Sequence, residues 1–130
     1  MTTENSYSTV QPETGRIAPN KIGSVAVFCG SRLGENPAFQ DAAHELGTGL
    51  GQRKIHLVYG GAEIGIMGIV ARAALAAGGE VTGVIRAFME ELEKPLVGVT
   101  RTIKTQNMHD RKWAMYELSD AFVIMPGGMG

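Results

Sequence analysis

The sequence predicts a parallel α/β fold, in which helices cover both faces of a single sheet. Two observations predict this class. Short apolar runs rich in β-branched residues alternate with segments of helical character, as they do in successive βαβ units. Glycines gather directly after these runs, and the chain has 18 glycines in 130 residues, where an average usage of about 7% would give about nine. Together they favour a Rossmann-like doubly wound sheet, whose ligands bind where the strands end.

The chain is expected to begin with a tail and one βα unit. Residues 1–21 hold few apolar residues and lack the charged-then-apolar pattern of a signal peptide, so we expect a flexible N-terminal tail. A Rossmann-like nucleotide-binding domain is then expected over residues 22–130. Its first strand is the run SVAVFCG at 24–30. The Asn-Pro pair at 36–37 suits the N-cap and first position of a helix, which we expect to reach about Arg53.

The middle of the chain repeats the strand-then-glycine pattern. IHLVYGG at 55–61 is expected to form the second strand and its loop, and VTGVIR at 81–86 the third strand. Between them the alanine-rich segment 66–77 has high helix propensity and is followed by two glycines, which suit a helix C-terminus. AFMEELEKP at 87–95 is predicted as a short helical turn that its proline stops.

The last third supplies the remaining elements. VGVTRTI at 97–103 is expected to be another strand. A helix is predicted from Asn107 to about Leu118, followed by the strand FVIMP at 122–126. Strands that alternate with helices over this length complete the doubly wound pattern.

Composition indicates one domain and excludes several classes of function. A chain of 130 residues can bury one core but not two. Twelve Lys and Arg against thirteen Asp and Glu give a net charge of −1 without a basic run, so nucleic acid is not an expected partner. The single cysteine excludes an internal disulfide, and no stretch approaches the ~20 apolar residues of a membrane span. A cytoplasmic protein without membrane contact is expected.

Three glycine loops are expected to meet at the carboxyl edge of the sheet. Bare N–H groups beside a helix N-terminus suit a phosphate, because the amides and the helix dipole both favour negative charge. A phosphorylated small molecule is therefore the expected ligand; the alternative is that the glycines only make tight βα turns. The loops are Gly30-Ser31-Arg32, Gly60 to Gly65 and Pro126 to Gly130.

The usual nucleotide motifs do not fit these loops. Gly60 and Gly65 have the spacing of the P-loop glycines, but Ile66 and Met67 stand where Lys and Ser or Thr are needed. The G-x-G-x-x-G dinucleotide pattern follows none of the strands. The three histidines lack the spacing of metal ligands. Neither a metal nor another cofactor is therefore expected.

Polar residues concentrate at the start of the last helix, in NMHDRKWAMYELSD. Asn107 can cap this helix, and Arg111 and Lys112 lie just inside it, where the dipole disfavours cations. A bound anion would remove that conflict. The alternative is a solvated helix face on which Asp110 compensates the two cations.

These residues carry a resemblance to a known family. Met108-His109-x-Arg111-Lys112, followed by a helix, a strand and Pro126-Gly127-Gly128-x-Gly130, resembles the paired signature of the LONELY GUY family of phosphoribohydrolases. The similarity covers roughly residues 24–130. Its further segments are Tyr59-Gly60-Gly61, Gly65-x-Met67-Gly68 and Phe28-Cys29-Gly30-Ser31.

The resemblance implies a Rossmann-like fold, a homodimer and a reaction. The family hydrolyses N6-substituted adenosine 5′-monophosphates, which are AMP-type substrates, to a free cytokinin base and ribose 5-phosphate. An older label for the motif is lysine decarboxylase. Nothing in the sequence resembles a pyridoxal phosphate site, and Lys112 as a Schiff-base lysine would lack an identified partner for the pyridine ring.

The resemblance also assigns roles to single residues. Arg111 matches the catalytic arginine, Lys112 is a nucleotide contact beside it, and Glu93 matches a glutamate that contacts the nucleotide. The expected 5′-phosphate loop is formed by Gly127, Gly128 and Gly130. The remaining substrate contacts expected from the similar loops are Ser31, Gly60 and Gly61.

The family pattern continues Thr-x-x-Glu after its final glycine, which places the glutamate four residues beyond Gly130. Cleavage of an N-glycosidic bond needs a carboxylate near the sugar. We therefore expect these 130 residues to be a shortened version of a longer parent, lacking C-terminal elements of the sheet and nearly inactive alone. The alternative is a non-catalytic nucleotide- or cofactor-binding or carrier protein on the same fold, which holds a phosphorylated ligand or a pterin-type cofactor.

Other residues are expected to be structural. Cys29 is predicted to be a small buried thiol, because no histidine partner is visible in the sequence. Met67, Met108 and Met115 are expected to fill the core, and Trp113 to lie in the core or at a dimer contact.

Overall fold

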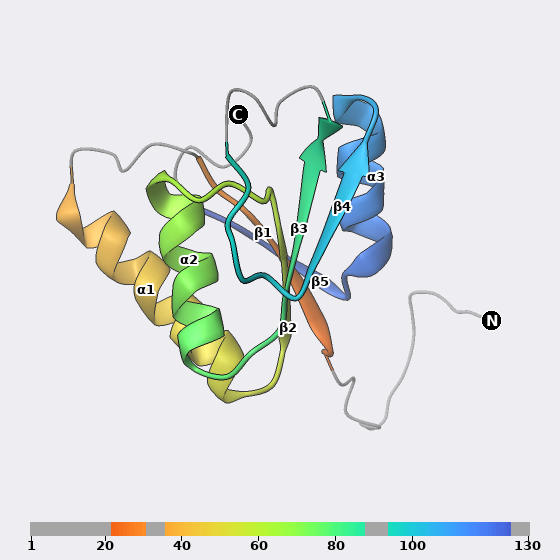
Figure 1. The fold of residues 1–130 in the computed structure, drawn as a ribbon. Coiled ribbons are helices and arrows are strands. Elements are labelled where there is room, and N and C mark those ends of the chain that lie inside the picture. Colours follow the sequence, from red (N-terminus) through yellow and green to blue (C-terminus); the bar gives the residue numbers. More distant parts are fainter. Residues whose placement is uncertain (1–21, 31–35, 88–93, 126–130) are drawn as a thin grey trace.

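A computed structural model describes residues 22–30, 36–87 and 94–125. These residues form a five-stranded sheet and three helices (Figure 1). In chain order the elements are β1 (Ser24–Phe28), α1 (Pro37–Gln52), β2 (His56–Tyr59), α2 (Gly65–Ala76), β3 (Val81–Arg86), β4 (Arg101–Thr105), α3 (Met108–Leu118) and β5 (Ala121–Ile124).

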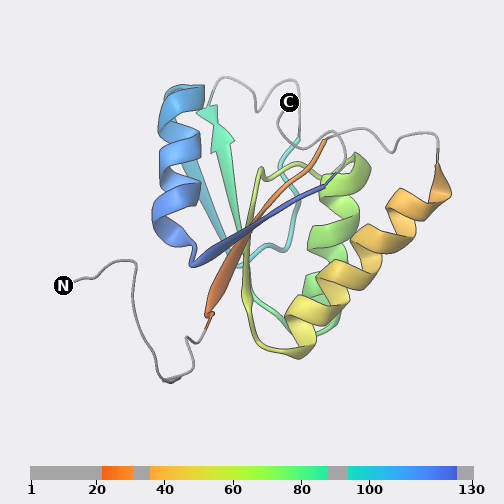
Figure 2. The same cartoon turned by 180° about the vertical axis from the view of Figure 1, so that it is seen from behind.

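The sheet is parallel throughout, in the order β4-β3-β2-β1-β5. Helices α1 and α2 cover one face and α3 covers the other, as the two opposite views show (Figures 1 and 2). The chain steps from β1 to β4 in one direction and then returns to place β5 on the free side of β1. Strand order therefore reverses at β1, and such a reversal puts a ligand crevice at the carboxyl ends of β1 and β5. The predicted doubly wound fold is confirmed.

The predicted helices are confirmed to within one or two residues, because their caps are visible in the sequence. The Asn36 side chain accepts a hydrogen bond from the Ala38 N–H at 2.9 Å, and Pro37 occupies the first helical position. Asn107 caps α3 by accepting from the Asp110 N–H at 2.8 Å. Just beyond α2, Gly78 has φ +88°, a left-handed conformation that glycine adopts without strain.

The strand predicted at 97–103 was misplaced, since β4 begins only at Arg101. Gly98 has φ +97° and breaks the extended run, and Val97 is 89% exposed in the resulting turn. β4 itself is an edge strand of mostly polar residues, which periodicity identifies poorly. Two other expectations, the tail at 1–21 and most of the helical turn at 87–95, fall outside the described residues.

Each face of the sheet has its own core. On the α1 and α2 face, alternate residues of the inner strands pack with the helices around Leu57 and Tyr59, which are fully buried. Two glycines let α1 approach α2 closely: a Cβ at Gly47 would overlap the Val70 carbonyl oxygen, and one at Gly51 would lie 2.6 Å from the Ala74 oxygen. The core under α3 is smaller and centres on Met115.

Candidate functional site

The loop after β2 is built from closely packed glycines. Gly61 has φ +89°, and a Cβ there would overlap the Ile85 side chain on β3. A Cβ on Gly83 would lie 2.9 Å from the Gly61 Cα. The Leu96 N–H donates to the Gly61 carbonyl at 3.0 Å, which ties the loop to the segment before β4. Glycine is thus required here to bring the ends of β2 and β3 together.

Arg111 spans the carboxyl ends of these two strands. Its Nε donates to the Val84 carbonyl oxygen at 2.8 Å, and one terminal nitrogen, Nη2, donates to the Gly60 carbonyl oxygen at 2.8 Å. The other, Nη1, lies 3.6 Å from the Met108 sulfur. A guanidinium has five N–H donors in a rigid plane and keeps its charge. The two carbonyl bonds therefore fix the orientation of a permanent cation at the edge where ligands bind.

Gly60 is required for this arrangement. A Cβ built on it would overlap Nη2 of Arg111 and would lie 3.0 Å from the Met67 sulfur. The strand-end glycine and the helix-start arginine, which are 51 residues apart in the chain, form one packed unit. Met67 and Met108, expected as core filler, lie half-buried beside this unit.

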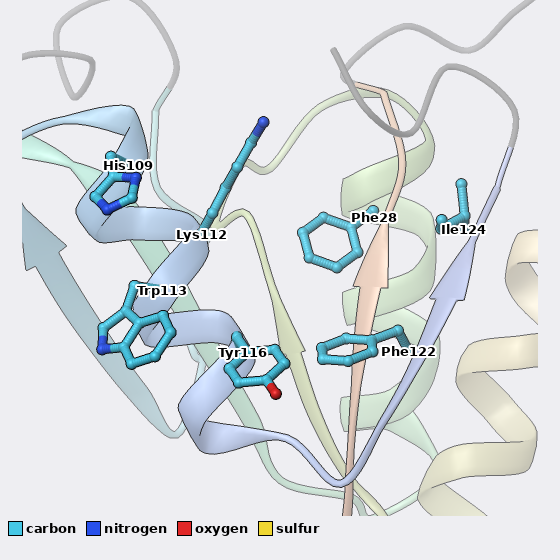
Figure 3. Close-up of a pocket in the computed structure, with 7 residues that line it drawn as sticks. All are labelled: Phe28, His109, Lys112, Trp113, Tyr116, Phe122 and Ile124. Carbon is cyan, nitrogen blue, oxygen red and sulfur yellow. The ribbon is translucent and has the colours of Figure 1, made fainter.

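Lys112 points in a different direction from Arg111, because consecutive helical residues are about 100° apart. It is exposed and extends from α3 toward the edge where β1 and β5 end (Figure 3). The two adjacent cations therefore serve different parts of the carboxyl edge. Arg111 lies over β2 and β3, and Lys112 faces the crevice beside β1.

The structure brings together the described members of the predicted site, Gly60, Gly61 and Arg111, and leaves Lys112 nearby. Five further predicted site residues lie outside the described residues, and their roles stay predictions: Ser31, Glu93, Gly127, Gly128 and Gly130.

Sequence reasoning missed an apolar groove of about 520 Å³ beside Lys112. Its rings form a chain: Trp113 stacks on Tyr116 with centroids 5.5 Å apart, and Tyr116 stacks on Phe122 at 5.6 Å. We name the five apolar lining residues Phe28, Trp113, Tyr116, Phe122 and Ile124 the aromatic groove (Figure 3). The available signal was the spacing of Trp113 and Tyr116 on one helix face.

Trp113 is 55% exposed and so does not lie in the core, whereas the alternative of a dimer contact stays a prediction. Cys29 is buried, as predicted, and burial raises the pKa of its thiol to about 12. A thiol with such a pKa stays protonated near neutral pH and is a poor nucleophile.

Among the described residues, no group of three or more His, Cys, Asp or Glu side chains is placed to hold a metal ion. No helix in the part of the chain that the structure describes is long and apolar enough to cross a membrane.

The chain matches a family model and is similar to individual relatives. A family model described as possible lysine decarboxylase matches residues 67–130. A cytokinin riboside 5′-monophosphate phosphoribohydrolase of Arabidopsis thaliana is 45% identical over 113 residues, which are 85% of this chain and 52% of the relative. An enzyme of the same name from Rhodococcoides fascians is 44% identical over 82% of this chain and 54% of its own length. The chain thus spans about half the length of these relatives.

Solved structures agree on the fold. A molybdenum cofactor binding protein from Rippkaea orientalis superposes with a TM-score of 0.68 at 19% identity, over 82% of this chain and 63% of that one. A molybdenum cofactor carrier protein from Chlamydomonas reinhardtii also gives 0.68, at 22% identity over 82% of this chain and 65% of its own. At these identities the likeness shows a common fold alone.

Proposed function

Because the chain belongs to the LONELY GUY family of cytokinin riboside 5′-monophosphate phosphoribohydrolases, we propose that the whole protein hydrolyses N6-substituted adenosine 5′-monophosphates. The products are a free cytokinin base and ribose 5-phosphate. The observation that carries the proposal is the guanidinium of Arg111, fixed by the Val84 and Gly60 carbonyls at the ligand-binding edge of the sheet.

Charge decides the orientation of the substrate. An AMP-type substrate carries its negative charge on the 5′-phosphate, which glycine N–H groups, a helix N-terminus and Lys112 would attract. We assign the phosphate to Gly127, Gly128 and Gly130, with Ser31 and Glu93 as further contacts to the nucleotide. Gly60 and Gly61 would meet the substrate through their backbone, because the space beside each Cα is occupied by the Arg111 guanidinium and by the Ile85 side chain.

Arg111 is assigned to the departing base. When the N-glycosidic bond breaks, the bond electrons move onto the base and the sugar becomes oxocarbenium-like. A fixed guanidinium beside the base stabilises this negative charge without reorganisation. Since arginine keeps its proton, it cannot act as the base that activates water. We assign that role to a carboxylate in residues that follow Gly130 in the whole protein, as the family pattern implies.

The lysine decarboxylase description fits the site less well than this reading. A Schiff-base lysine requires a lowered pKa and a cofactor held against it. Lys112 is exposed. The two named relatives are both phosphoribohydrolases.

The proposal also covers the oligomeric state and the cellular compartment of the protein. We propose a homodimer, as the family resemblance implies, and a cytoplasmic location, as the composition of the chain predicts. Sedimentation equilibrium of the whole protein tests the first, and cell fractionation tests the second. A monomer at micromolar concentration, or recovery with the membrane fraction, would contradict the respective proposal.

The experiment that tests the function is free-base release by a form of the protein that continues past Gly130. Isopentenyladenosine 5′-monophosphate should yield the free base and ribose 5-phosphate in equal amounts. The matched nucleoside without the 5′-phosphate should be cleaved far more slowly, because it lacks the group that the glycine loop and Lys112 are assigned to bind. Binding of the nucleotide without release of base would support the carrier alternative and overturn the hydrolase.

A further inference from the structure

A second pocket lies at the amino ends of the strands, at the opposite edge of the sheet from Gly60 and Arg111 (Figure 1). Its volume of about 310 Å³ is at the lower end of the roughly 300–1,000 Å³ of small-molecule sites. We name it the amino-edge pocket. Two apolar residues line it together with four polar ones: Val58, Leu118, His56, Thr82, Arg101 and Asp120.

One end of the amino-edge pocket is negative. The Asp120 carboxylate accepts hydrogen bonds through Oδ2 from the Gly23 and Ser24 N–H groups, at 2.7 and 3.1 Å. Among the described residues its other oxygen, Oδ1, has no hydrogen-bond or ion-pair partner. Helix α3 ends at Leu118 without a basic residue in its last turn, so no cation there neutralises the negative end of the helix dipole. Both features favour a bound cation at this end.

The other end of the pocket is positive. Arg101 is the first residue of β4 and pairs with Thr82 on β3. Its guanidinium forms no hydrogen bond or ion pair within the part of the chain that the structure describes. Asp120 lies against the start of β1, which is three strand positions from β4, or about 14 Å at a spacing of about 4.8 Å. Two opposite charges therefore line one pocket without neutralising each other.

Between these charges the pocket offers a buried hydrogen-bond acceptor. His56 Nδ1 lies 3.3 Å from Glu80 Oε1, and His56 Nε2 lies 2.6 Å from Thr82 Oγ1. Because a carboxylate only accepts, Nδ1 of the neutral imidazole carries the hydrogen, and the Thr82 hydroxyl donates to Nε2. The Thr82 oxygen then keeps lone pairs for a further N–H donor. Since Thr82 is only 3% exposed, that donor has to come from within the pocket.

We propose that the amino-edge pocket binds a small zwitterion of the free amino acid class. The ammonium group has three N–H donors and donates to Asp120 Oδ1 and the Thr82 oxygen. The carboxylate accepts paired hydrogen bonds from the Arg101 guanidinium. Val58 and Leu118 contact an aliphatic side chain. A plain amine would meet the like charge of Arg101, and a plain carboxylate that of Asp120, so the pocket selects molecules that carry both charges.

Isothermal titration calorimetry of the whole protein tests the proposal with three probes that share one carbon skeleton. L-Valine carries both charges, isobutylamine carries only the ammonium group, and isovalerate carries only the carboxylate. L-Valine should bind with a Kd below about 1 mM, and the other two at least tenfold more weakly. Equal affinity for L-valine and either single-charge probe would overturn the proposal. So would the absence of saturable binding by both L-valine and glycine at about 10 mM.

Two variants separate the contributions of the two charges. Asp120→Asn keeps one oxygen for the backbone N–H groups but puts an NH₂ donor in place of the free oxygen, so L-valine should bind at least tenfold more weakly and isovalerate no more weakly. Arg101→Met should weaken L-valine equally and spare isobutylamine. Lys104→Met is the matched control, because strand alternation places Lys104 on the opposite face of β4 from Arg101. Undiminished L-valine affinity in both pocket variants would contradict the proposal.

Methyl NMR of the unsubstituted protein keeps the proposal testable if a variant does not fold. L-Valine should shift the methyl signals of Val58 and Thr82, which line the pocket, and leave that of Ile85, which packs at Gly61. Shifts confined to Ile85 would place the ligand at the other edge of the sheet and refute the proposal. None of these readouts involves base release, so the proposed hydrolysis stands or falls separately.

Discussion

Replacing Gly60 by alanine should displace Arg111 and destabilise the protein through that displacement. Gly60 does not have a left-handed φ, so its backbone accepts alanine. The added methyl group, however, would overlap Nη2 of Arg111, and the guanidinium must move. Movement lengthens the 2.8 Å bonds to the Gly60 and Val84 carbonyls.

The size of the effect follows from these two bonds. A hydrogen bond to a charged group contributes about 1.5–3 kcal/mol, so losing both sets an upper limit of about 3–6 kcal/mol. Arg111 is only half-buried, and water can replace part of what is lost. We expect a loss of about 2 kcal/mol in the free energy of unfolding.

A double-mutant cycle with urea unfolding tests the reasoning. If the methyl group acts through Arg111, then Gly60→Ala should cost little once Arg111→Ala has removed the guanidinium, giving an interaction energy of about 1–2 kcal/mol. Gly49→Ala is the matched control; its methyl group would meet only the mobile end of Arg53 at 3.1 Å, and it should stabilise α1 by about 0.5–1 kcal/mol. Additive losses from Gly60→Ala and Arg111→Ala would refute the reasoning.

Three further predictions concern the scaffold. Gly47→Ala should lower the free energy of unfolding by about 1–3 kcal/mol in urea titrations, because its Cβ would overlap the Val70 carbonyl and lie 2.8 Å from the Ala73 Cβ; a neutral result would mean that α1 and α2 separate easily. Lys54→Gly should raise the Tm, since Lys54 has φ +59° directly after α1 and a left-handed conformation costs a side-chain-bearing residue about 1–2 kcal/mol; a lower Tm would contradict this. Burial raises the pKa of Cys29 to about 12, so the stability that its neutral thiol contributes is complete below about pH 9 and is lost as the pH rises from about 9 to 12. Alkylation at pH 8 should be at least tenfold slower in the folded than in the unfolded chain, and equal rates would refute the burial argument.

The fold could be predicted from the sequence wherever local signals and the global fold agree. Asn36 and Asn107 mark their helices because caps act over two or three residues. The strand predicted at 97–103 was misplaced because the β-branched residues around Gly98 form a turn. Only the pairing with β3 in the folded protein shows where β4 begins. A weakly apolar edge strand carries little local information.

The site was predictable by residue type but not by geometry. The signature identified Gly60 and Arg111 separately, yet nothing local indicates that one methyl group on the first would displace the second. The aromatic groove was missed for a similar reason. Phe28 on β1 is far in the chain from Trp113 on α3 and Phe122 on β5, and each alone has the pattern of an ordinary core residue.

The measurement that tests the central claim most directly is the effect of Arg111→Ala on the chemical step, separated from binding. With isopentenyladenosine 5′-monophosphate and the whole protein, kcat should fall by at least 100-fold, in line with loss of a fixed charge-stabilising group, while Kd changes less than tenfold. Arg53→Ala, which removes an exposed cation directly after α1, should leave both constants unchanged and controls for net charge. An equal loss in kcat/KM and in affinity, with kcat retained, would contradict the claim that Arg111 acts on the departing base.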